Sequence, residues 1–307
     1  MDPIWQWGIS LIIAIQTIHG PVLDAIFRGI SFLGEEEFYL LLFPTLLWCV
    51  ETRLGFRIGL IFLLSVYVNS LVKEAVAHPR PFELEPSVQL GDAQGYGLPS
   101  GHAQNAAIIW GGIAAQARRR WVWVAAIVLA GAIGFSRVYL GVHFPTDVLA
   151  GWAIGAVLLT VWLGGYSGAG RRIRRWPLAM QIALAAAVPS ALALLFPDPG
   201  AVSATGAMAG VGAGYAVSVR YLAVGVDGPW WQRVLRFVVG AAVLAALYLG
   251  LRLILPGQEA PLGLVIRFAR YAALGLWISL GAPWLFGVLH LGPRRAPRSP
   301  IAQPAHR

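Results

Sequence analysis

The sequence predicts an all-α protein, a polytopic bundle of membrane helices, and three observations support this prediction. Hydrophobic residues make up 58% of the 307 positions and charged residues 12%, about half the charged share of a typical soluble protein. The apolar residues form long runs, and the basic residues stand in short clusters between these runs. The net charge of +9 does not indicate a nucleic-acid partner, because such proteins carry their basic residues along one polar face.

Nine apolar stretches are long enough, at about 1.5 Å per residue, to cross roughly 30 Å of hydrocarbon, the third only just. They lie at residues 35–51, 54–77, 102–117, 121–138, 145–164, 178–196, 201–219, 234–255 and 262–290. An arginine-rich connection separates the first five from the last four. We therefore expect the following regions: a transmembrane core at 35–165, a basic cytoplasmic linker at 166–177, an extra C-terminal four-helix transmembrane bundle at 178–290, and a cytoplasmic tail at 291–307.

Residues 1–34 form a separate N-terminal region. Its apolar run, residues 4–18, is too short to cross a bilayer alone, and Pro21 separates it from a mixed stretch with Asp24 and Arg28. We favour a hairpin of two helices in the membrane interface over a single kinked span. The run lacks a basic leader and an obvious cleavage site, so we do not expect a signal peptide.

Loop charges predict the orientation of the spans. If the spans alternate, basic residues gather on one side, which the positive-inside rule makes cytoplasmic. These residues are Arg53, Arg57, Arg118, Arg119, Arg120, Arg171, Arg172, Arg174 and Arg175. The opposite side carries Glu35, Glu36, Glu37, Glu83, Glu85 and Asp92. We therefore expect a multi-pass protein of a bacterial-type plasma membrane with a cytoplasmic C-terminus.

Three cations of the core fall on the extracytoplasmic side. Lys73 and Arg80 are two helical turns apart, and Pro81 then forces the chain into a loop. Arg137 ends the fourth core stretch at the same side, and its planar guanidinium suits phosphate oxygens. Taken singly, each could be a cation that snorkels from a span end. Together they predict an extracytoplasmic phosphate site.

The tetrapeptide Pro99-Ser100-Gly101-His102 stands directly before an apolar stretch. Backbone N–H groups at a helix N-terminus bind anions, and we expect those of Ser100 to His102 to be free. Gly101 lets the backbone approach a ligand, and the Ser100 hydroxyl can cap the helix or bind a phosphate oxygen. Capping alone does not explain His102.

His143 and Asp147 are four residues apart at the start of the next stretch. One helical turn would place the carboxylate beside the imidazole, although Pro145 makes the local geometry uncertain. The carboxylate would fix the imidazole tautomer and make the other ring nitrogen a better nucleophile; a purely structural pair is the alternative. Cys49 is the only cysteine, and these segments lack the acidic cluster of a two-metal phosphatase. We expect no metal and no other cofactor.

Together, Lys73 to Arg80-Pro81, residues 99–102, and Ser136-Arg137 to His143 and Asp147 resemble the three-part signature of the type 2 phosphatidic acid phosphatase superfamily. The resemblance covers about residues 20–165. It implies that His143 attacks phosphorus to give a phosphohistidine, that His102 protonates the leaving oxygen and later activates water, and that Asp147 orients His143. The residues that would bind the phosphoryl oxygens are Lys73, Arg80, Ser100, Gly101 and Arg137.

A site at the outer mouth of a helix bundle suits a phosphorylated membrane lipid, either phosphatidate-like or a sphingoid phosphate. The loop from Phe82 to Leu98 is expected to cover the mouth and select the head group. The segments 32–35 and 96–99 loosely resemble the sphingosine-1-phosphate phosphatase branch. Alternatives are a polyprenyl (undecaprenyl) diphosphate phosphatase, a lipid-to-lipid phosphotransferase, and a transporter or scaffold with a residual catalytic core.

Three further features complete these expectations. Arg267 and Arg270 share a helical face in the C-terminal bundle and are candidates for head-group contacts or for docking this bundle against the core; snorkelling, or pairing with Glu259, is the alternative. His78 lies beside the signature and is interpreted as a rim residue. A homo-oligomer is left open.

Overall fold

The computed structural model describes residues 2–222, 225–255 and 262–292. Every regular element within these ranges is a helix, which confirms the all-α prediction. The expected cytoplasmic tail lies almost entirely outside the described residues, as does Glu259. The chain divides into two compact units, each built from several segments. Among the described residues, the first comprises 2–42, 57–172 and 196–204, and the second comprises 43–56, 173–195, 205–222, 225–255 and 262–292.

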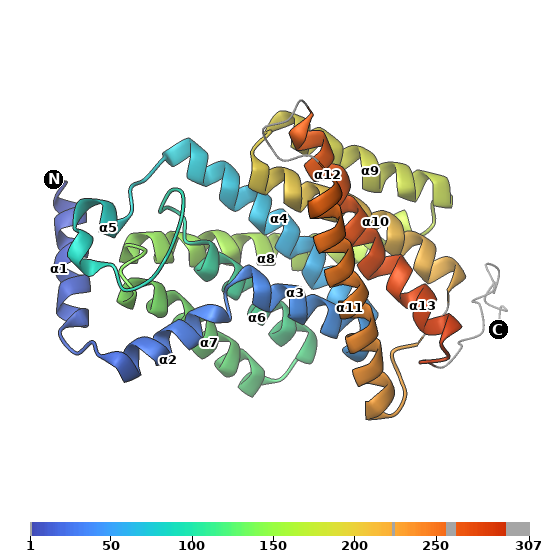
Figure 1. Ribbon diagram of the computed structural model, residues 1–307, viewed down its shortest axis with the longest axis horizontal. Helices are drawn as coiled ribbons and strands as arrows, with labels where there is room; N and C mark the ends of the chain where they lie inside the picture. The colour runs from blue at the N-terminus through green and yellow to red at the C-terminus, as the bar shows by residue number, and fades with distance from the viewer. Residues whose placement is uncertain (1, 223–224, 256–261, 293–307) are drawn as a thin grey trace. The chain divides into compact units, whose positions relative to one another are not determined.

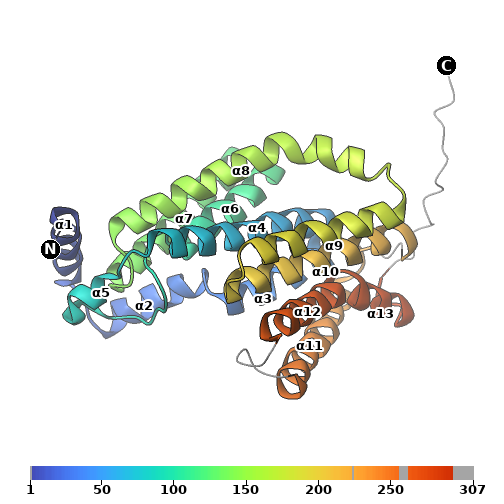
Figure 2. The same cartoon turned by 90° about the horizontal axis from the view of Figure 1, so that it is seen from above.

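The first unit contains the helices that carry the sequence signature. Its elements are α1 (Pro3–Gln16), α2 (Pro21–Phe32), most of α3 (Glu36–Thr45), most of α4 (Thr52–Val76), α5 (Pro81–Leu84), the 3₁₀ turn η2 (Pro86–Val88), α6 (Gly101–Ala117), α7 (Arg120–Tyr139) and α8 (Pro145–Ile173). Helices α4, α6, α7 and α8 run alongside one another, and α1 lies at one end of them (Figures 1 and 2). That end carries the candidate site.

The second unit is also helical. Its elements are the π-helical turn η1 (Leu46–Val50), α9 (Leu178–Leu195), most of α10 (Pro199–Tyr221), α11 (Trp230–Ile254), α12 (Gly263–Leu276), the π-helical turn η3 (Trp277–Gly281) and α13 (Ala282–Val288). Helix α10 packs closely on α12: a Cβ added at Gly206 would lie only 2.5 Å from the carbonyl oxygen of Phe268. The absence of a side chain at Gly206 therefore lets the two helices approach closely.

Seven helical segments in the described part of the chain are long and apolar enough to cross a membrane, so the protein is a multi-pass membrane protein. They are residues 52–84, 120–139, 145–173, 178–195, 199–221, 230–254 and 263–288. The other two expected stretches are helical but shorter. Helix α6 has 17 residues, and residues 36–50 divide into α3 and η1.

The N-terminal region forms two helices, α1 and α2, separated by residues 17–20. They are built into the first unit, since α1 packs on α5, η2 and α7 while α2 packs on α7. Ile9 and Ile12 of α1 are buried in one apolar cluster with Phe144 and Val148. Helix α1 thus reaches the segment that carries the His–Asp pair.

Glycines of α8 bring this helix onto the start of α6. A Cβ at Gly151 would lie 2.5 Å from the carbonyl oxygen of Ser100, and one at Gly155 would lie 2.6 Å from that of Gln104. Any larger residue would push the two helices apart. The close packing holds the loop before α6 against the first turns of α8.

Candidate active site

The end of α4 sets the direction of the first signature segment. Lys73 lies in the last turn, and Ala77 adopts a left-handed conformation with φ of 49° while its N–H donates to the Lys73 carbonyl at 2.8 Å. This is a common way to end a helix. The chain turns there and leads through His78 to Arg80. The charges of Arg80, Arg137 and Asp147 all act on Lys73.

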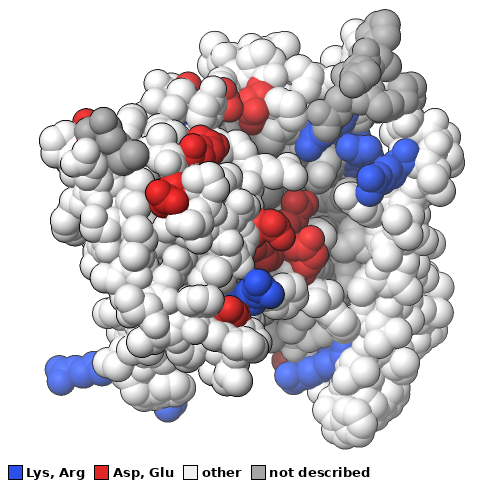
Figure 3. All heavy atoms as spheres, turned by 60° about the vertical axis from the view of Figure 1, so that its left-hand side comes forward, with Lys and Arg blue, Asp and Glu red and all other residues white. Residues whose placement is uncertain are grey.

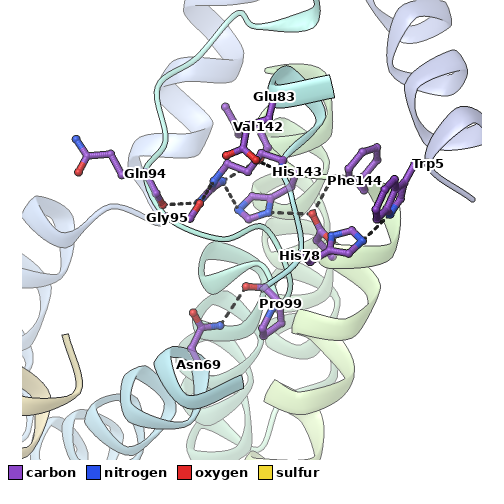
Figure 4. Close-up of polar contacts among 12 residues, drawn as sticks. Trp5, Asn69, His78, Glu83, Gln94, Gly95, Pro99, Val142, His143 and Phe144 are labelled. Atoms are coloured by element: carbon purple, nitrogen blue, oxygen red, sulfur yellow. Dashed lines mark hydrogen bonds and ion pairs between the residues drawn. The ribbon is translucent and has the colours of Figure 1, made fainter. Parts of the chain in front are cut away.

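Arg80 joins two loops of the site. Its side chain is 3% exposed, and its Nε donates to the Gly95 carbonyl at 2.6 Å and its Nη2 to the Gln94 carbonyl at 2.7 Å. Its Nη1 donates to the Val142 carbonyl at 2.8 Å and lies 3.3 Å from Nε2 of His143 (Figure 4). Arg80 therefore fixes both the loop after η2 and the segment that bears His143.

His143 and Asp147 contact each other as their spacing predicts. Pro145 opens α8 at its first position, so it does not disturb the turn. Oδ2 of Asp147 lies 3.3 Å from Nδ1 of His143 and accepts from the Phe144 N–H at 2.9 Å. Arg80 can only donate a hydrogen bond. Neutral His143 therefore presents an unprotonated Nε2 to Arg80 and its Nδ1–H to Asp147.

The surroundings of His143 also favour the neutral imidazole. Burial is the main cause that lowers the pKa of His143 well below its ordinary value, and the charges of Arg80, Lys73 and Arg137 lower it further. His143 is 2% exposed and lies in the loop between α7 and α8. A buried, neutral imidazole with one ring nitrogen held by a carboxylate is suited to nucleophilic attack.

Glu35, which precedes α3, connects the other histidine to the third cation. Its Oε1 lies 3.1 Å from Nε2 of His102 and 3.4 Å from Nη1 of Arg137. Nη1 of Arg137 also donates to Oγ of Ser31. The hydrogen bond from His102 lowers the pKa of Glu35, which is therefore ionised near neutral pH. The loop charges predict that Glu35 lies on this side of the membrane, but nothing in the sequence predicts its part in the site.

The loop before α6 differs in one respect from the sequence-based expectation. The Ser100 N–H is not free, because it donates to the carbonyl of Asp147 at 2.9 Å. The N–H groups of Gly101 and His102 remain without a partner among the described residues. The Ser100 hydroxyl is buried and makes no hydrogen bond within the described ranges. It is therefore available to a ligand.

A buried polar network supports this loop from beneath. Nδ2 of Asn69 in α4 donates to the Pro99 carbonyl at 3.3 Å and to Oε1 of Gln104 at 2.9 Å. Nε2 of Gln104 donates to Oγ of Ser65 at 2.8 Å, and that hydroxyl donates to Oδ1 of Asn105 at 2.8 Å. Nothing in the sequence marks these residues as part of a site, since their polar groups interrupt the apolar runs without a recognisable pattern.

His78 is not a rim residue, contrary to our interpretation of the sequence. Its Nδ1 lies 3.3 Å from Oδ1 of Asp147, and its Nε2 accepts a hydrogen bond from Nε1 of Trp5 at 2.8 Å (Figure 4). The exposed fraction of the His78 side chain is 15%. Asp147 is thus flanked by two imidazoles, His143 at one carboxylate oxygen and His78 at the other.

Arg267 and Arg270 lie in α12, which belongs to the second unit. Their guanidinium groups lie 5.7 and 5.6 Å from the ring centroid of Tyr271. The structure thus brings them to one aromatic side chain. In the described part of the chain, no three His, Cys, Asp or Glu side chains converge as ligands for one metal ion.

The fold and the site define a multi-pass α-helical membrane protein in which Lys, Arg and His side chains converge at one end of a helix bundle, a combination suited to phosphoryl groups. Residues 54–170 match the family described as PAP2 superfamily. Residues 202–295 match the family described as PAP2 superfamily phosphatase, transmembrane extension. The chain belongs to the PAP2 superfamily, the type 2 phosphatidic acid phosphatases, and carries a transmembrane extension known in that superfamily.

Three similar proteins carry names of lipid phosphatases. Lipid phosphate phosphatase delta of Arabidopsis thaliana is 31% identical over 51% of this chain and 41% of its own length. Phosphatidylglycerophosphatase B of Bacillus subtilis is 33% identical over 47% of this chain and 76% of its own length. A probable sphingosine-1-phosphate phosphatase of Dictyostelium discoideum is 29% identical over 52% of this chain and 43% of its own length. The chain thus spans less than half the length of two of these relatives.

Proposed function

We propose that the protein is an integral membrane phosphatase that removes the phosphate of a membrane lipid through a phosphohistidine on His143. The observation that carries this proposal is the position of His143 between Arg80, 3.3 Å from Nε2, and Asp147, 3.3 Å from Nδ1. This arrangement leaves the nucleophilic nitrogen unprotonated and next to a cation that attracts a phosphoryl group. Membership of a phosphatase superfamily supports the same reaction.

In the first step, Nε2 of His143 forms a bond to phosphorus while the bond from phosphorus to the ester oxygen breaks. Positive charge then develops on the His143 ring, and the Asp147 carboxylate at Nδ1 stabilises it. His102 gives its proton to the leaving lipid oxygen. Burial lowers the pKa of His102, and Glu35 supports this role by opposing that shift, because a carboxylate 3.1 Å from the ring favours the protonated imidazole.

In the second step, water attacks the phosphohistidine and the P–N bond breaks. His102, now neutral, takes the proton of that water, and inorganic phosphate leaves. Lys73, Arg80 and Arg137, the Ser100 hydroxyl, and the N–H groups of Gly101 and His102 bind the phosphoryl oxygens and the charge that develops on them. Three cations can supply the charge stabilisation for which other phosphatases use metal ions, so we propose that the reaction needs no metal.

We further propose that the site faces the extracytoplasmic side and takes its substrate from that leaflet. Glu36, Glu37, Glu83 and Asp92 are exposed on the loops and helix starts around the site, and acidic side chains gather on this face (Figure 3). The arginine clusters between α6 and α7 and after α8 lie at the opposite helix ends. The positive-inside rule places those ends in the cytoplasm.

The loop that we expected to cover the site begins with the two short helical turns α5 and η2. It remains our candidate for head-group selection, because its residues 94 and 95 hold Arg80 in place. Phosphatidate-like and sphingoid phosphates are the proposed substrates. The names of the relatives cover both a glycerolipid and a sphingoid phosphate, so a substrate panel must separate them.

The test is phosphate release by purified protein in detergent with EDTA present. The panel contains phosphatidate, phosphatidylglycerol phosphate, a sphingoid phosphate and undecaprenyl diphosphate. We expect turnover of at least one lipid monoester, a covalent phosphoryl label that is stable to base and lost in acid, and loss of both in His143→Ala. A matched control is His19→Ala, an exposed histidine outside the site. Full activity of His143→Ala, or activity abolished by EDTA, would contradict the proposed mechanism.

The same panel distinguishes the alternatives. Turnover of undecaprenyl diphosphate alone would identify a polyprenyl diphosphate phosphatase. Lipid that gains a phosphate, seen by mass spectrometry, would identify a phosphotransferase in which a lipid replaces water as the acceptor. Lipid movement across vesicles without phosphate release would favour a transporter or scaffold with a residual catalytic core.

A further inference from the structure

We infer that His78 and Trp5 form a second orienting arm for the nucleophile, acting on Asp147 from the side opposite His143. This inference rests on the proposed function. His78 does not touch the reacting atoms in this arrangement and is a positioning residue. Its role is to hold the carboxylate that in turn holds His143. Trp5 contributes from α1, a helix that lies outside the sequence signature.

The hydrogen-bond direction follows from the chemistry of the indole. Trp5 Nε1–H can only donate, and it lies 2.8 Å from Nε2 of His78. Neutral His78 must therefore accept at Nε2 and carry its proton on Nδ1. Nδ1 lies 3.3 Å from Oδ1 of Asp147, an ion-pair contact whose geometry in this structure is not that of a hydrogen bond. The indole thus selects the tautomer of His78 that can donate to the carboxylate.

The carboxylate needs this second donor. Asp147 is fully buried, and its Oδ2 already receives the Phe144 N–H at 2.9 Å and faces His143 at 3.3 Å. Oδ1 makes no hydrogen bond within the described residues, and Nδ1 of His78 lies 3.3 Å from it. A buried carboxylate oxygen without a donor is costly, so the loss of His78 would weaken the ionised form of Asp147.

The protein frame holds the pair in position. The His78 ring packs in T-shaped contacts with Trp5 and with Phe144, and the ring centroids are 5.6 Å apart in both cases. The His78 carbonyl accepts from the Gly97 N–H at 2.7 Å, and a Cβ at Gly97 would come within 3.1 Å of Oδ2 of Asp147. His78 is therefore held by its backbone, by two aromatic rings and by the hydrogen bond at Nε2.

Other charged groups in this region must be considered before a pH effect is assigned to His78. The charge of Asp2 acts on His78 itself. The side chains whose charges act on His143 are Lys73, Arg80, Arg137 and His102. None of these is altered by a change at His78, so a shift in the pH profile of such a variant reports the His78–Asp147 contact.

The experiment compares His78→Phe, which keeps a ring but no N–H, with His78→Asn, whose amide can donate from nearly the position of Nδ1. Trp5→Phe removes only the indole N–H. We expect kcat of His78→Phe to fall roughly 10-fold to 100-fold, as when a partner that orients a metal-bound histidine is lost. KM should stay within about twofold, and the acid limb of the rate profile should move to higher pH, because a less stabilised carboxylate takes up a proton more readily.

His78→Asn should recover most of the lost rate, and Trp5→Phe should show a smaller change in the same direction. The control is Trp7→Phe on the same helix, where the indole is 53% exposed. In an Asp147→Asn background, His78→Phe should have little further effect, because both changes act through one carboxylate. His78→Asn and Trp5→Phe test the inference even if His78→Phe does not fold.

Three outcomes would overturn the inference. The first is an unchanged rate and pH profile in His78→Phe. The second is a loss of kcat in His78→Asn as large as that in His78→Phe. The third is a loss of kcat on adding His78→Phe to Asp147→Asn as large as that in the wild-type background, which would indicate a purely structural role. If the wild-type protein releases phosphate and His78→Phe has the same rate and pH profile, this inference is overturned but the proposed function is not. A wild-type protein inactive on every lipid would overturn the proposed function and this inference with it.

Discussion

The carboxylate of Glu35 lies 3.1 Å from Nε2 of His102, although 67 positions separate the two residues in the chain. The same oxygen lies 3.4 Å from Nη1 of Arg137. An anion in this place favours a protonated His102 and balances Arg137 while no phosphate is bound. We expect Glu35 to set the upper pH limit of activity.

Glu35→Gln should therefore lower kcat most strongly above neutral pH. Without the carboxylate, His102 loses its proton more readily, so the alkaline limb of the rate profile should move to lower pH. A shift of one pH unit corresponds to about a tenfold loss on that limb. The measurement is kcat against pH on a lipid substrate. Glu37→Gln is the control, because Glu37 is exposed two residues away; an unmoved alkaline limb in Glu35→Gln would refute the role.

Gly34 is required for the approach of His102. A Cβ at position 34 would collide with Cδ2 of His102 and would lie 2.9 Å from its Cγ. We expect Gly34→Ala to displace the ring and reduce kcat at least roughly 100-fold, since a displacement of about 1 Å can cost that much. The matched control is Gly29→Ala, where a Cβ would meet nothing within 4 Å. Wild-type turnover of Gly34→Ala would show that His102 has room to move.

The lower pH limit should reflect the His143–Asp147 pair, because protonation of His143 removes the nucleophile and protonation of Asp147 removes the partner that orients it. Burial and neighbouring cations lower the pKa of His143, so its neutral form persists as the solution becomes acidic. The acid limb of kcat/KM should therefore lie below pH 6.5, about the ordinary histidine value. The phosphate group of the substrate also loses its second proton at a pH of about 6, close to the ordinary histidine pKa. Two substrates with different phosphate pKa values separate these sources, because only a limb that belongs to the enzyme stays in place. A limb above pH 6.5 for both would contradict the expected environment.

Much of the fold could be predicted because membrane helices depend on the hydropathy and spacing of residues that are close together in the sequence. The apolar runs predicted all nine helical stretches. The spacing of His143 and Asp147 predicted their contact, since residues four positions apart in a helix meet across one turn. The break at Pro21 likewise divided the N-terminal region into two helices. These features depend on hydropathy and helix geometry alone.

The contacts of the site that could not be predicted from the sequence all depend on tertiary packing. Trp5 reaches His78 across 73 positions, and nothing local distinguishes its indole from the exposed one of Trp7. Glu35 looked like one of several acidic residues in a loop, because its contact with His102 arises only when the start of α3 meets the start of α6. The Ser100 N–H was expected to be free for the related reason that its acceptor, the Asp147 carbonyl, belongs to another helix.

Asn69 should control the position of the loop before α6, which carries Ser100. Asn69→Leu removes the donor to the Pro99 carbonyl and to Oε1 of Gln104, and leaves two buried acceptors unpaired. Each unpaired group costs about 1–3 kcal/mol, so we expect a lower thermal midpoint together with a raised KM. Thermal unfolding in detergent and substrate titration measure the two effects. Ser10→Ala, which removes an exposed hydroxyl of α1, is the control; an unchanged midpoint in Asn69→Leu would show that the network is not needed.

Arg267 and Arg270 test whether the transmembrane extension contributes to substrate choice. Both guanidinium groups lie over Tyr271, and we propose that they help to bind an anionic head group. The double change Arg267→Gln and Arg270→Gln should raise KM roughly tenfold for phosphatidylglycerol phosphate, since a hydrogen bond to a charged group contributes about 1.5–3 kcal/mol. Sphingoid phosphate, which lacks the second anionic group, should be less affected. Arg220→Gln at an exposed helix end is the control. Equal kinetics of the double variant and the wild type on both lipids, at equal expression, would exclude the contact and leave the two arginines a role in helix packing.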